Sequence, residues 1–435
     1  MSNPESRTSS PAGGGERCFI VFVLLLSSGA FLNLLPSEST GNRAVAGNAA
    51  MQGLWASLYV VVVILLIRYC KGFISRLASD PWTLTLLLLS FGSTIWSADP
   101  GLTLKRSIGL LGTYLTAVYL AMRYDLRTQL RLVAFALMPA LVLSPPFTLL
   151  GIGECGTDFG GPPGWCGIYS HKNTLGAMMA LAILVFLTMS RIEAQRKWLM
   201  WFLVMVSVGM LLLSNSKSAL ISVFGVMVVL MFSRLLRGSV RLAITSVTIG
   251  VASASCVLYW VMQDLGRFTA FLNRDATFSG RLELWVFSVV MALQKPWLGY
   301  GYGAFWLGRD GPSERIMHAL GSWQAFYAHN GLLELWLDLG LISVVVFIGG
   351  FLTCLVRAIL LLRRSSEPES AWPLLFLAFI FFTNLVESSL LSPDNISWIL
   401  YLQLAFFLSP ASQRSGYNAF AHTQLRRRPL HVQTT

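Results

Sequence analysis

The sequence predicts an all-α polytopic membrane protein with about twelve transmembrane helices and one large loop on the outer side. Charged residues make up only 12% of the 435 residues, about half the ~25% of an average soluble domain. Hydrophobic residues reach 55%, and they come in runs near the ~20 residues that a helix needs to cross a membrane. This composition excludes a water-soluble enzyme, and it excludes a disordered chain, which would need low hydrophobicity.

The apolar runs define the expected elements in order. Residues 1–17 are polar and rich in Ser, Pro and Gly, which is typical of a disordered cytoplasmic tail. Helix-length runs follow at 18–35, 50–67, 82–97, 104–122, 129–150, 174–190, 198–214, 218–235, 242–263, 331–361, 371–391 and 395–410. We therefore expect transmembrane helices 1–9 within 18–263, helices 10–12 within 331–410, and a basic cytoplasmic tail over 411–435.

Basic residues are concentrated in every second connection between these runs. This set holds Arg68, Lys71, Arg76, Arg123, Arg127, Arg131, Arg191, Arg196, Lys197, Arg234, Arg237, Arg241, Arg357, Arg363 and Arg364. The alternate short connections hold only Arg43, Lys105, Arg106, Lys172 and Lys217. Because cytoplasmic loops carry the excess of Lys and Arg, both termini are predicted to be cytoplasmic. The net charge of +12 therefore orients helices, and no nucleic-acid partner is expected.

One outer connection, 264–330, is much longer than the others and rich in Phe, Trp and Tyr. A loop of this length without structure of its own would be unusual. Residues 280–293 show helical spacing, with Leu282, Trp285, Val286, Val289 and Leu293 as an apolar stripe. We expect a folded periplasmic subdomain at the membrane–water interface, where Trp and Tyr are favoured.

Two residues of this region are candidates for chemistry. His329 stands at the outer start of the tenth span, where a general base could act because imidazole titrates near neutrality. The alternative is an interfacial His that caps the helix. Arg281 follows Ser279-Gly280 at the start of the amphipathic segment. Its planar guanidinium could bind a phosphate through two hydrogen bonds, or it could extend to lipid headgroups.

Three further cations lie in the outer connections. Lys217 occupies a tight turn before the eighth span, Arg106 begins the fourth span beside Lys105, and Lys172 opens the sixth span after a Gly/Pro-rich loop. Each could contact an anionic ligand or a headgroup. The sequence shows no metal-ligand cluster, no carboxylate pair suited to glycoside hydrolysis and no GxSxG motif. A cationic outer cleft with one His would suit a lipid-linked phosphate or pyrophosphate.

Cys155 and Cys166 flank the Gly/Pro-rich loop on the predicted outer side. In an oxidising compartment they could form a disulfide. Two free thiols are the alternative.

Three stretches carry a resemblance to a known family. They are Ser279-Gly280-Arg281-Leu282-Glu283-Leu284-Trp285, Pro296-Trp297-Leu298-Gly299-Tyr300-Gly301-Tyr302-Gly303 and His329-Asn330-Gly331-Leu332-Leu333-Glu334. Together they resemble the O-antigen ligase and Wzy-type polymerase superfamily over about 80–411. Ser216-Lys217 is similar to that family's Ser-Arg element, with Lys in place of the commoner Arg. His329-Asn330, followed after nine residues by Gly340, is similar to the ligase His motif, with Ser343 where Gly, Thr or Tyr is usual. The segment from His171 to Gly176 is more similar to the exopolysaccharide polymerase branch.

The resemblance implies a GT-C-like glycosyltransferase that takes a glycan from undecaprenyl pyrophosphate on the periplasmic face of the bacterial inner membrane. It implies no metal, nucleotide sugar or other cofactor. His329 would be the base, Arg281 and Lys217 would bind the diphosphate, and Arg106 and Lys172 would be weaker candidates for the same task. Trp323 and Tyr327 could form a sugar-stacking wall beside His329. Polysaccharide export and chain-length proteins are possible partners.

Three functions remain open from the sequence. A polymerase would move the glycan to another lipid-linked repeat, and a ligase would move it to lipid A-core. A lipid-linked glycan flippase is the third, although a flippase should carry charges within several spans, and most charges here lie at the span ends.

The charge pattern generates a topology prediction. A reporter fused after Arg196 should be active only as a cytoplasmic reporter, and one fused after Asp310 only as a periplasmic reporter. Alkaline phosphatase and green fluorescent protein fusions measure this directly. Both sites reporting the same side would contradict the topology.

Overall fold

A computed structural model describes residues 12–34, 49–152, 164–236, 281–308, 311–319 and 325–410. This part of the chain is helical and contains no β-strand, so the predicted all-α class is confirmed. Two predicted features lie outside the described residues, namely the span 242–263 and the tail 411–435. Residues 1–11 of the expected N-terminal tail and Trp323 also lie outside them.

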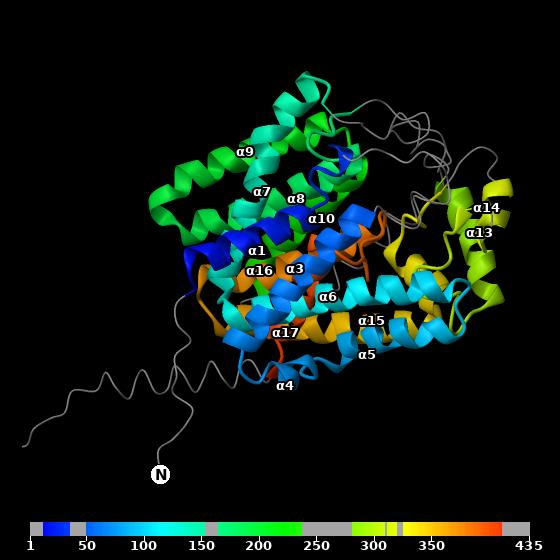
Figure 1. The fold of residues 1–435 in the computed structure, drawn as a ribbon. Helices are drawn as coiled ribbons and strands as arrows, with labels where there is room; N and C mark the ends of the chain where they lie inside the picture. The colour runs from blue at the N-terminus through cyan, green and yellow to red at the C-terminus, as the bar shows by residue number, and fades with distance from the viewer. Residues whose placement is uncertain are drawn as a thin grey trace, which may run out of the picture.

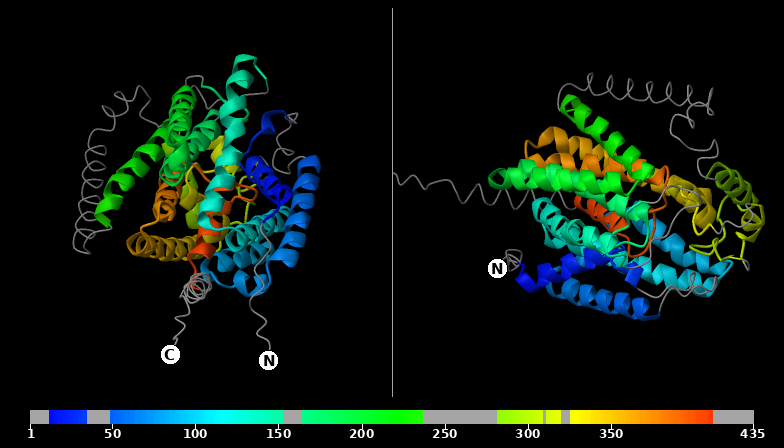
Figure 2. Two further views of the ribbon diagram at one scale, coloured as in Figure 1. Left: turned by 90° about the vertical axis from the view of Figure 1, so that its left-hand side faces the viewer. Right: turned by 90° about the horizontal axis from the view of Figure 1, so that it is seen from above.

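The other eleven predicted ranges each contain a helix (Figure 1). The helices are α1 (Gly14–Ser27), α3 (Ala49–Tyr69), α4 (Phe73–Leu77), α5 (Pro81–Gly92), α6 (Pro100–Arg123), α7 (Leu126–Leu149), α8 (Lys172–Ile192), α9 (Lys197–Leu213), α10 (Lys217–Leu236), α13 (Arg281–Gln294), α14 (Glu314–Ala319), α15 (Gly331–Arg364), α16 (Trp372–Asn384) and α17 (Ile396–Phe407). Seen from above, most long helices lie roughly side to side, with the yellow-green segment of α13 and α14 at one end (Figure 2, right).

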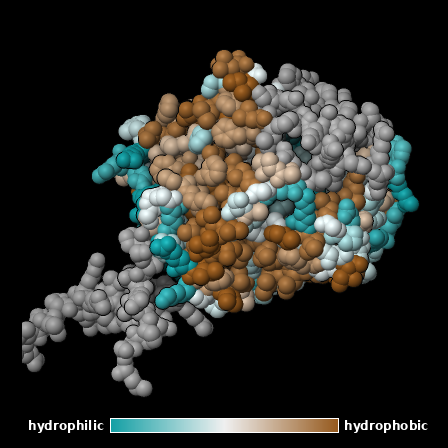
Figure 3. All heavy atoms as spheres, in the orientation of Figure 1, coloured by the Kyte–Doolittle hydropathy of each residue, from teal (hydrophilic) through white to brown (hydrophobic). Residues whose placement is uncertain are grey.

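Several helices have the length and composition of membrane spans. Within the described residues, five qualify: Ala49–Tyr69, Leu126–Leu149, Lys172–Ile192, Ala194–Leu213 and Gly331–Arg364. On the face shown in Figure 3, hydrophobic residues cover much of the described surface between more polar residues at its two ends. These features agree with a polytopic membrane protein. Twelve crossings and the GT-C arrangement stay predictions, because α1, α16 and α17 are shorter than a full span.

The helix starts follow from capping residues in the sequence. Asp80, Asp99 and Asp125 cap α5, α6 and α7, each accepting a hydrogen bond from the backbone N–H three residues later. Pro81 and Pro100 occupy the first helical position of α5 and α6, where no N–H is needed. Asn330 caps α15 through two backbone N–H groups, those of Leu332 and Leu333, both at 3.1 Å.

Ion pairs gather at one end of the bundle. Arg123 at the end of α6 lies 2.7 Å from Glu16 in the first turn of α1. The hydroxyls of Tyr119 and Tyr124 also donate to that carboxylate. Two more pairs join neighbouring connections, Arg131 with Glu193 and Arg127 with Glu369. Connections predicted to share one side of the membrane therefore meet at one end, although which side this end faces stays a prediction.

Helix α15 is broken at Gly340, whose φ of 75° lies in the left-handed region. The break leaves the carbonyls of Leu337 and Asp338 without partners inside the helix. The N–H groups of Tyr300 and Gly301 donate to them at 2.8 and 2.9 Å. The glycine-rich segment 296–303 therefore pairs with a broken helix through its backbone, and the family resemblance of this segment has a structural basis.

Close approach explains two glycines of this pairing. A Cβ on Gly340 would overlap the carbonyl of Trp297, and one on Gly299 would lie 2.6 Å from the carbonyl oxygen of Leu337. The hydroxyl of Ser343 donates to the carbonyls of Gly340 at 2.7 Å and Leu335 at 3.0 Å. Ser343 thus satisfies carbonyls at the break.

The described part of the outer loop forms a small subdomain around α13 and α14, at the right of Figure 1. The predicted helix over 280–293 is confirmed as α13. Its buried face consists of Leu284, Ser288, Met291 and Ala292, and packs against Tyr300, Phe305 and Trp306. Of the predicted stripe, Val286, Val289 and Leu293 are exposed, whereas Trp285 packs against the same buried cluster. That this stripe faces the membrane interface stays a prediction.

Cys166 is disulfide-bonded. This finding agrees with the predicted pairing, although Cys155 lies outside the described residues.

The break in α15 generates a stability prediction. Gly340→Ala should lower stability by more than about 2 kcal/mol, because Ala is strained at positive φ and its methyl group would push Trp297 away. Thermal unfolding of the detergent-purified protein measures this. Gly209→Ala in α9 is the matched control, since a Cβ there meets nothing within 4 Å. Equal midpoints for the two variants would contradict the assignment.

Candidate functional site

The candidate site is centred on Glu387, in the loop 385–395 between α16 and α17. Its carboxylate contacts three other parts of the chain. Oε1 lies 3.1 Å from Nη2 of Arg281 and accepts a hydrogen bond from Ser218 at 3.3 Å. Oε2 lies 3.3 Å from Nδ1 of His329. One carboxylate therefore joins the starts of α10, α13 and α15.

Arg281 is the first residue of α13, and its guanidinium is anchored on the loop of Glu387. Nη1 donates to the carbonyl of Val386 at 2.5 Å, while Nη2 faces Glu387. Only 13% of the side chain is exposed. The sequence predicted that Arg281 and His329 belong to one site. In the structure both side chains contact the carboxylate of Glu387.

His329 immediately precedes the capping residue of α15 and has a positive φ of 50°. A non-glycine residue in this region costs energy, so its surroundings must hold it there. The N–H of Asn330 donates to the hydroxyl of Ser388 at 3.1 Å, and the side chain of Asn330 donates to the carbonyl of Leu385 at 3.3 Å. These bonds fix the strained residue beside Glu387.

The rest of the His motif supports this placement. Gly331 lies so close to Asn384 that a Cβ would overlap the amide side chain. The carboxylate of Glu334 accepts the N–H of Ala328 at 2.6 Å, which closes the turn before His329. The indole of Trp285 on α13 donates to the carbonyl of Ala328 at 2.9 Å. The motif therefore positions one imidazole rather than supplying several reactive groups.

The loop that carries Glu387 is shaped by Asn384. Its amide accepts the N–H of Ser389 at 2.8 Å and donates to the hydroxyl of Ser389 at 2.9 Å. This pair of bonds ends α16 at residue 384, whereas the sequence predicted a span over 371–391. That range was too long, and it placed Glu387 inside the membrane.

Glu387 is ionised in these surroundings. Burial raises its pKa, but the hydrogen bond with His329 and the positive charge of Arg281 outweigh burial and leave the pKa below its usual value. The site therefore combines a buried anion with two cation-forming side chains, which is how buried charges are tolerated in proteins.

Lys217 and Lys172 open two helices that start near this group. Lys217 directly precedes Ser218, which contacts Glu387. Lys172, the buried first residue of α8, lies one turn before Gly176. A Cβ on Gly176 would be 2.5 Å from the side chain of Ser216, so α8 and α10 pack closely at their starts. Binding of an anion by either Lys remains a prediction.

Arg106 and the predicted sugar wall have separate outcomes. The guanidinium of Arg106 donates to the carbonyl of Gly303 at 2.5 Å, so this residue supports the glycine-rich segment. Its proposed contact with a diphosphate stays untested. The ring of Tyr327 lies 4.2 Å from that of His329, next to the predicted base. Trp323, the other member of the wall, lies outside the described residues.

Sequence reasoning missed Glu387 and Ser218. A signal for Glu387 existed, because an isolated carboxylate inside an apolar run is a candidate functional residue by default. Ser218 gave no such signal, since serine is common at helix starts. Among the described residues, no group of His, Cys, Asp and Glu could hold a metal ion.

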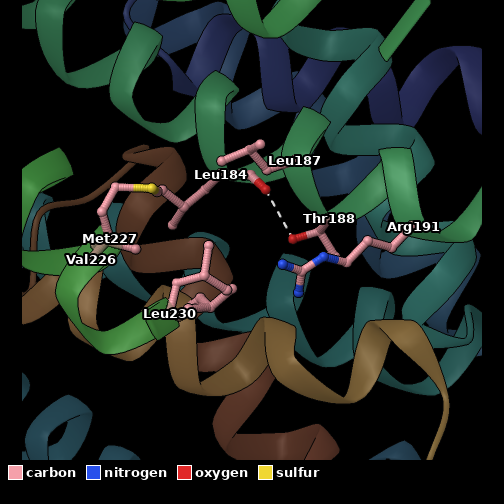
Figure 4. A pocket seen from close by; sticks show the side chains of 8 residues that line it. Leu184, Leu187, Thr188, Arg191, Val226, Met227 and Leu230 are labelled. Carbon is pink, nitrogen blue, oxygen red and sulfur yellow. Dashed lines mark hydrogen bonds between the residues drawn. The ribbon is translucent and has the colours of Figure 1, made fainter. Parts of the chain in front are cut away.

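A recess at the other end of α8 and α10 is lined mainly by apolar side chains, including Leu184, Val226 and Leu375, with Arg191 at one side (Figure 4). It contains none of the predicted site residues. Arg191 belongs to the basic set predicted to be cytoplasmic.

Comparison with known proteins supports the motif-based resemblance. A family model described as O-antigen ligase matches residues 202–348. The chain is also 27% identical over 432 residues to the exopolysaccharide production protein ExoQ of Rhizobium meliloti (strain 1021), covering 94% of this chain and 93% of that protein. The resemblance to the O-antigen ligase and Wzy-type family is confirmed.

The O-antigen ligase match covers part of the site. It includes Lys217, Arg281 and His329, while Arg106 and Lys172 precede it and Glu387 follows it. The similarity to ExoQ extends over nearly the whole chain.

Proposed function

We propose that this protein is a glycosyltransferase of the periplasmic face of the bacterial inner membrane. It moves a glycan from undecaprenyl pyrophosphate to a hydroxyl of an acceptor sugar, as an exopolysaccharide or O-antigen polymerase. The observation that carries this proposal is the joining of His329 and Arg281 through Glu387, where α10, α13 and α15 begin. The proposed base and the proposed phosphate-binding cation thus contact the same carboxylate.

The electrostatics of the site suit a diphosphate. Helix N-termini carry partial positive charge and favour anions. Three helices start around Glu387, and Lys217 and Arg281 are the first residues of two of them. Arg281 would bind oxygens of the diphosphate through two hydrogen bonds, and Lys217 would add a point charge. Lys172 and Arg106 remain weaker candidates.

The reaction follows from the leaving group. His329 takes the proton of the acceptor hydroxyl as the oxygen forms a bond to the anomeric carbon. The bond from that carbon to the diphosphate oxygen breaks, and its electron pair leaves with the diphosphate, where Arg281 stabilises the charge. Direct displacement inverts the anomeric carbon. Because the diphosphate is already a good leaving group, this chemistry requires no metal or organic cofactor.

The ExoQ similarity favours a polymerase, because it spans almost the whole chain and that relative is described as an exopolysaccharide production protein. The family description favours a second candidate, an O-antigen ligase that transfers the glycan to lipid A-core. The two share a donor and differ in the acceptor. Other partners would be the lipid bilayer and proteins for export and chain length.

The acceptor is tested by deleting the gene in its own host. A polymerase deletion should abolish high-molecular-weight polysaccharide and accumulate single repeats on the lipid carrier. A ligase deletion should leave polymer intact and remove glycan from lipid A-core. Gel analysis of polysaccharide and of extracted lipid-linked repeats distinguishes the two. Loss of neither product would contradict the proposed function.

The base is tested by complementing that deletion with His329→Gln. Gln keeps hydrogen bonding but cannot accept a proton at neutral pH, so product formation should fall about 10²- to 10⁴-fold while the protein reaches the membrane in normal amounts. His318→Gln, an exposed His of α14, is the matched control and should complement fully. Substantial product from His329→Gln would make His329 a structural residue of the turn before α15.

A further inference from the structure

We propose that Glu387 is a positioning residue of this site. It orients the imidazole of His329 for proton transfer, and it binds Arg281 until a diphosphate replaces Glu387 as the partner of Arg281. This inference rests on the proposed function, because it gives Glu387 a task in the same transfer reaction. Glu387 lies outside the matched domain and outside the three motif stretches that carry the family resemblance.

The orientation of His329 follows from hydrogen-bond chemistry. An ionised carboxylate only accepts hydrogen bonds, and the lowered pKa of Glu387 keeps it ionised. Nδ1 of His329, 3.3 Å from Oε2, must therefore carry the proton. In the neutral ring this leaves the lone pair on Nε2. Nε2 is then the atom that can remove a proton from an acceptor hydroxyl.

Backbone contacts keep the ring on this partner. The positive φ of His329 places the residue at a sharp turn, and Asn330 ties that turn to Leu385 and Ser388 on both sides of Glu387. The imidazole and the carboxylate are thus held by the same pair of loops. An adventitious ion pair would not need backbone hydrogen bonds that hold both of its residues in place.

Arg281 is held by weaker means than a diphosphate would provide. Among the described residues its guanidinium donates to one neutral carbonyl and one carboxylate oxygen, while a guanidinium has five N–H donors. A diphosphate offers several charged oxygens and binds Arg through paired hydrogen bonds. When the diphosphate binds Arg281, the ion pair between Arg281 and Glu387 is broken. Glu387 can then stabilise the protonated form of His329 after His329 has accepted a proton.

The test uses the full chain in detergent with three variants. Glu387→Gln removes the charge and keeps the shape, and Arg281→Lys removes the paired phosphate contact. Glu369→Gln is the control, because Glu369 contacts Arg127 at 3.2 Å at the opposite end of α16 and the same charge is lost there. Three quantities are measured for each: binding of undecaprenyl pyrophosphate, turnover of the host's lipid-linked repeat against pH, and the thermal midpoint.

Glu387→Gln should lower turnover roughly 10- to 100-fold, the range for one charge-assisted hydrogen bond, without weakening binding of undecaprenyl pyrophosphate. The acid limb of its pH–rate profile should move to lower pH, since the protonated imidazole has lost its anionic partner. Tyr327, whose ring lies 4.2 Å from that of His329, is unchanged in this variant. Arg281→Lys should weaken binding, and Glu369→Gln should match the wild type throughout.

Three results would overturn the assignment. Wild-type turnover and pH profile in Glu387→Gln would show that Glu387 has no part in the reaction. A parallel loss of binding, turnover and thermal midpoint would make it a structural residue. A wild-type protein that binds the lipid but forms no product would contradict the proposed function itself, and this inference with it.

Discussion

The break of α15 at Gly340 is the constraint on which the half of the molecule that holds the candidate site depends. A continuous helix would use the carbonyls of Leu337 and Asp338 internally. The break frees them for the glycine-rich segment 296–303, and this pairing fixes the segment between α15 and α6. The subdomain of α13 packs on the same surface, so the position of Arg281 relative to His329 follows from one glycine in a span.

The site shows how a membrane protein concentrates charge without exposing it to lipid. Its ionisable groups lie at helix starts and in a loop, where helix dipoles and paired partners offset the cost of burial. Arg281, His329 and Glu387 come from segments far apart in sequence, yet each is less than one-sixth exposed. Each charged member of this group has a partner from a distant segment, which links the electrostatics of the site to the tertiary packing.

The sequence predicted much of the fold because apolar runs and charge alternation reflect the bilayer directly. The starts of α5, α6 and α15 could be read from their capping Asp and Asn residues. Glu387 could not be placed, because Asn384 ends α16 through bonds to Ser389 that no local propensity reveals. The buried face of α13 was equally inaccessible, since its apolar stripe suits both lipid and protein. Motif order identified Arg281 and His329, but only tertiary contacts identify the acid between them.

The carboxylate of Glu16 has a consequence for biosynthesis. It lies in the first turn of α1, and its partner Arg123 follows 107 residues later. During synthesis α1 leaves the ribosome long before α6, so Glu16 is made long before its partner Arg123. Stable docking of α1 must therefore await insertion of α6, together with Tyr119 and Tyr124. We therefore expect the first helix of the chain to dock late, after the neighbouring helices have assembled.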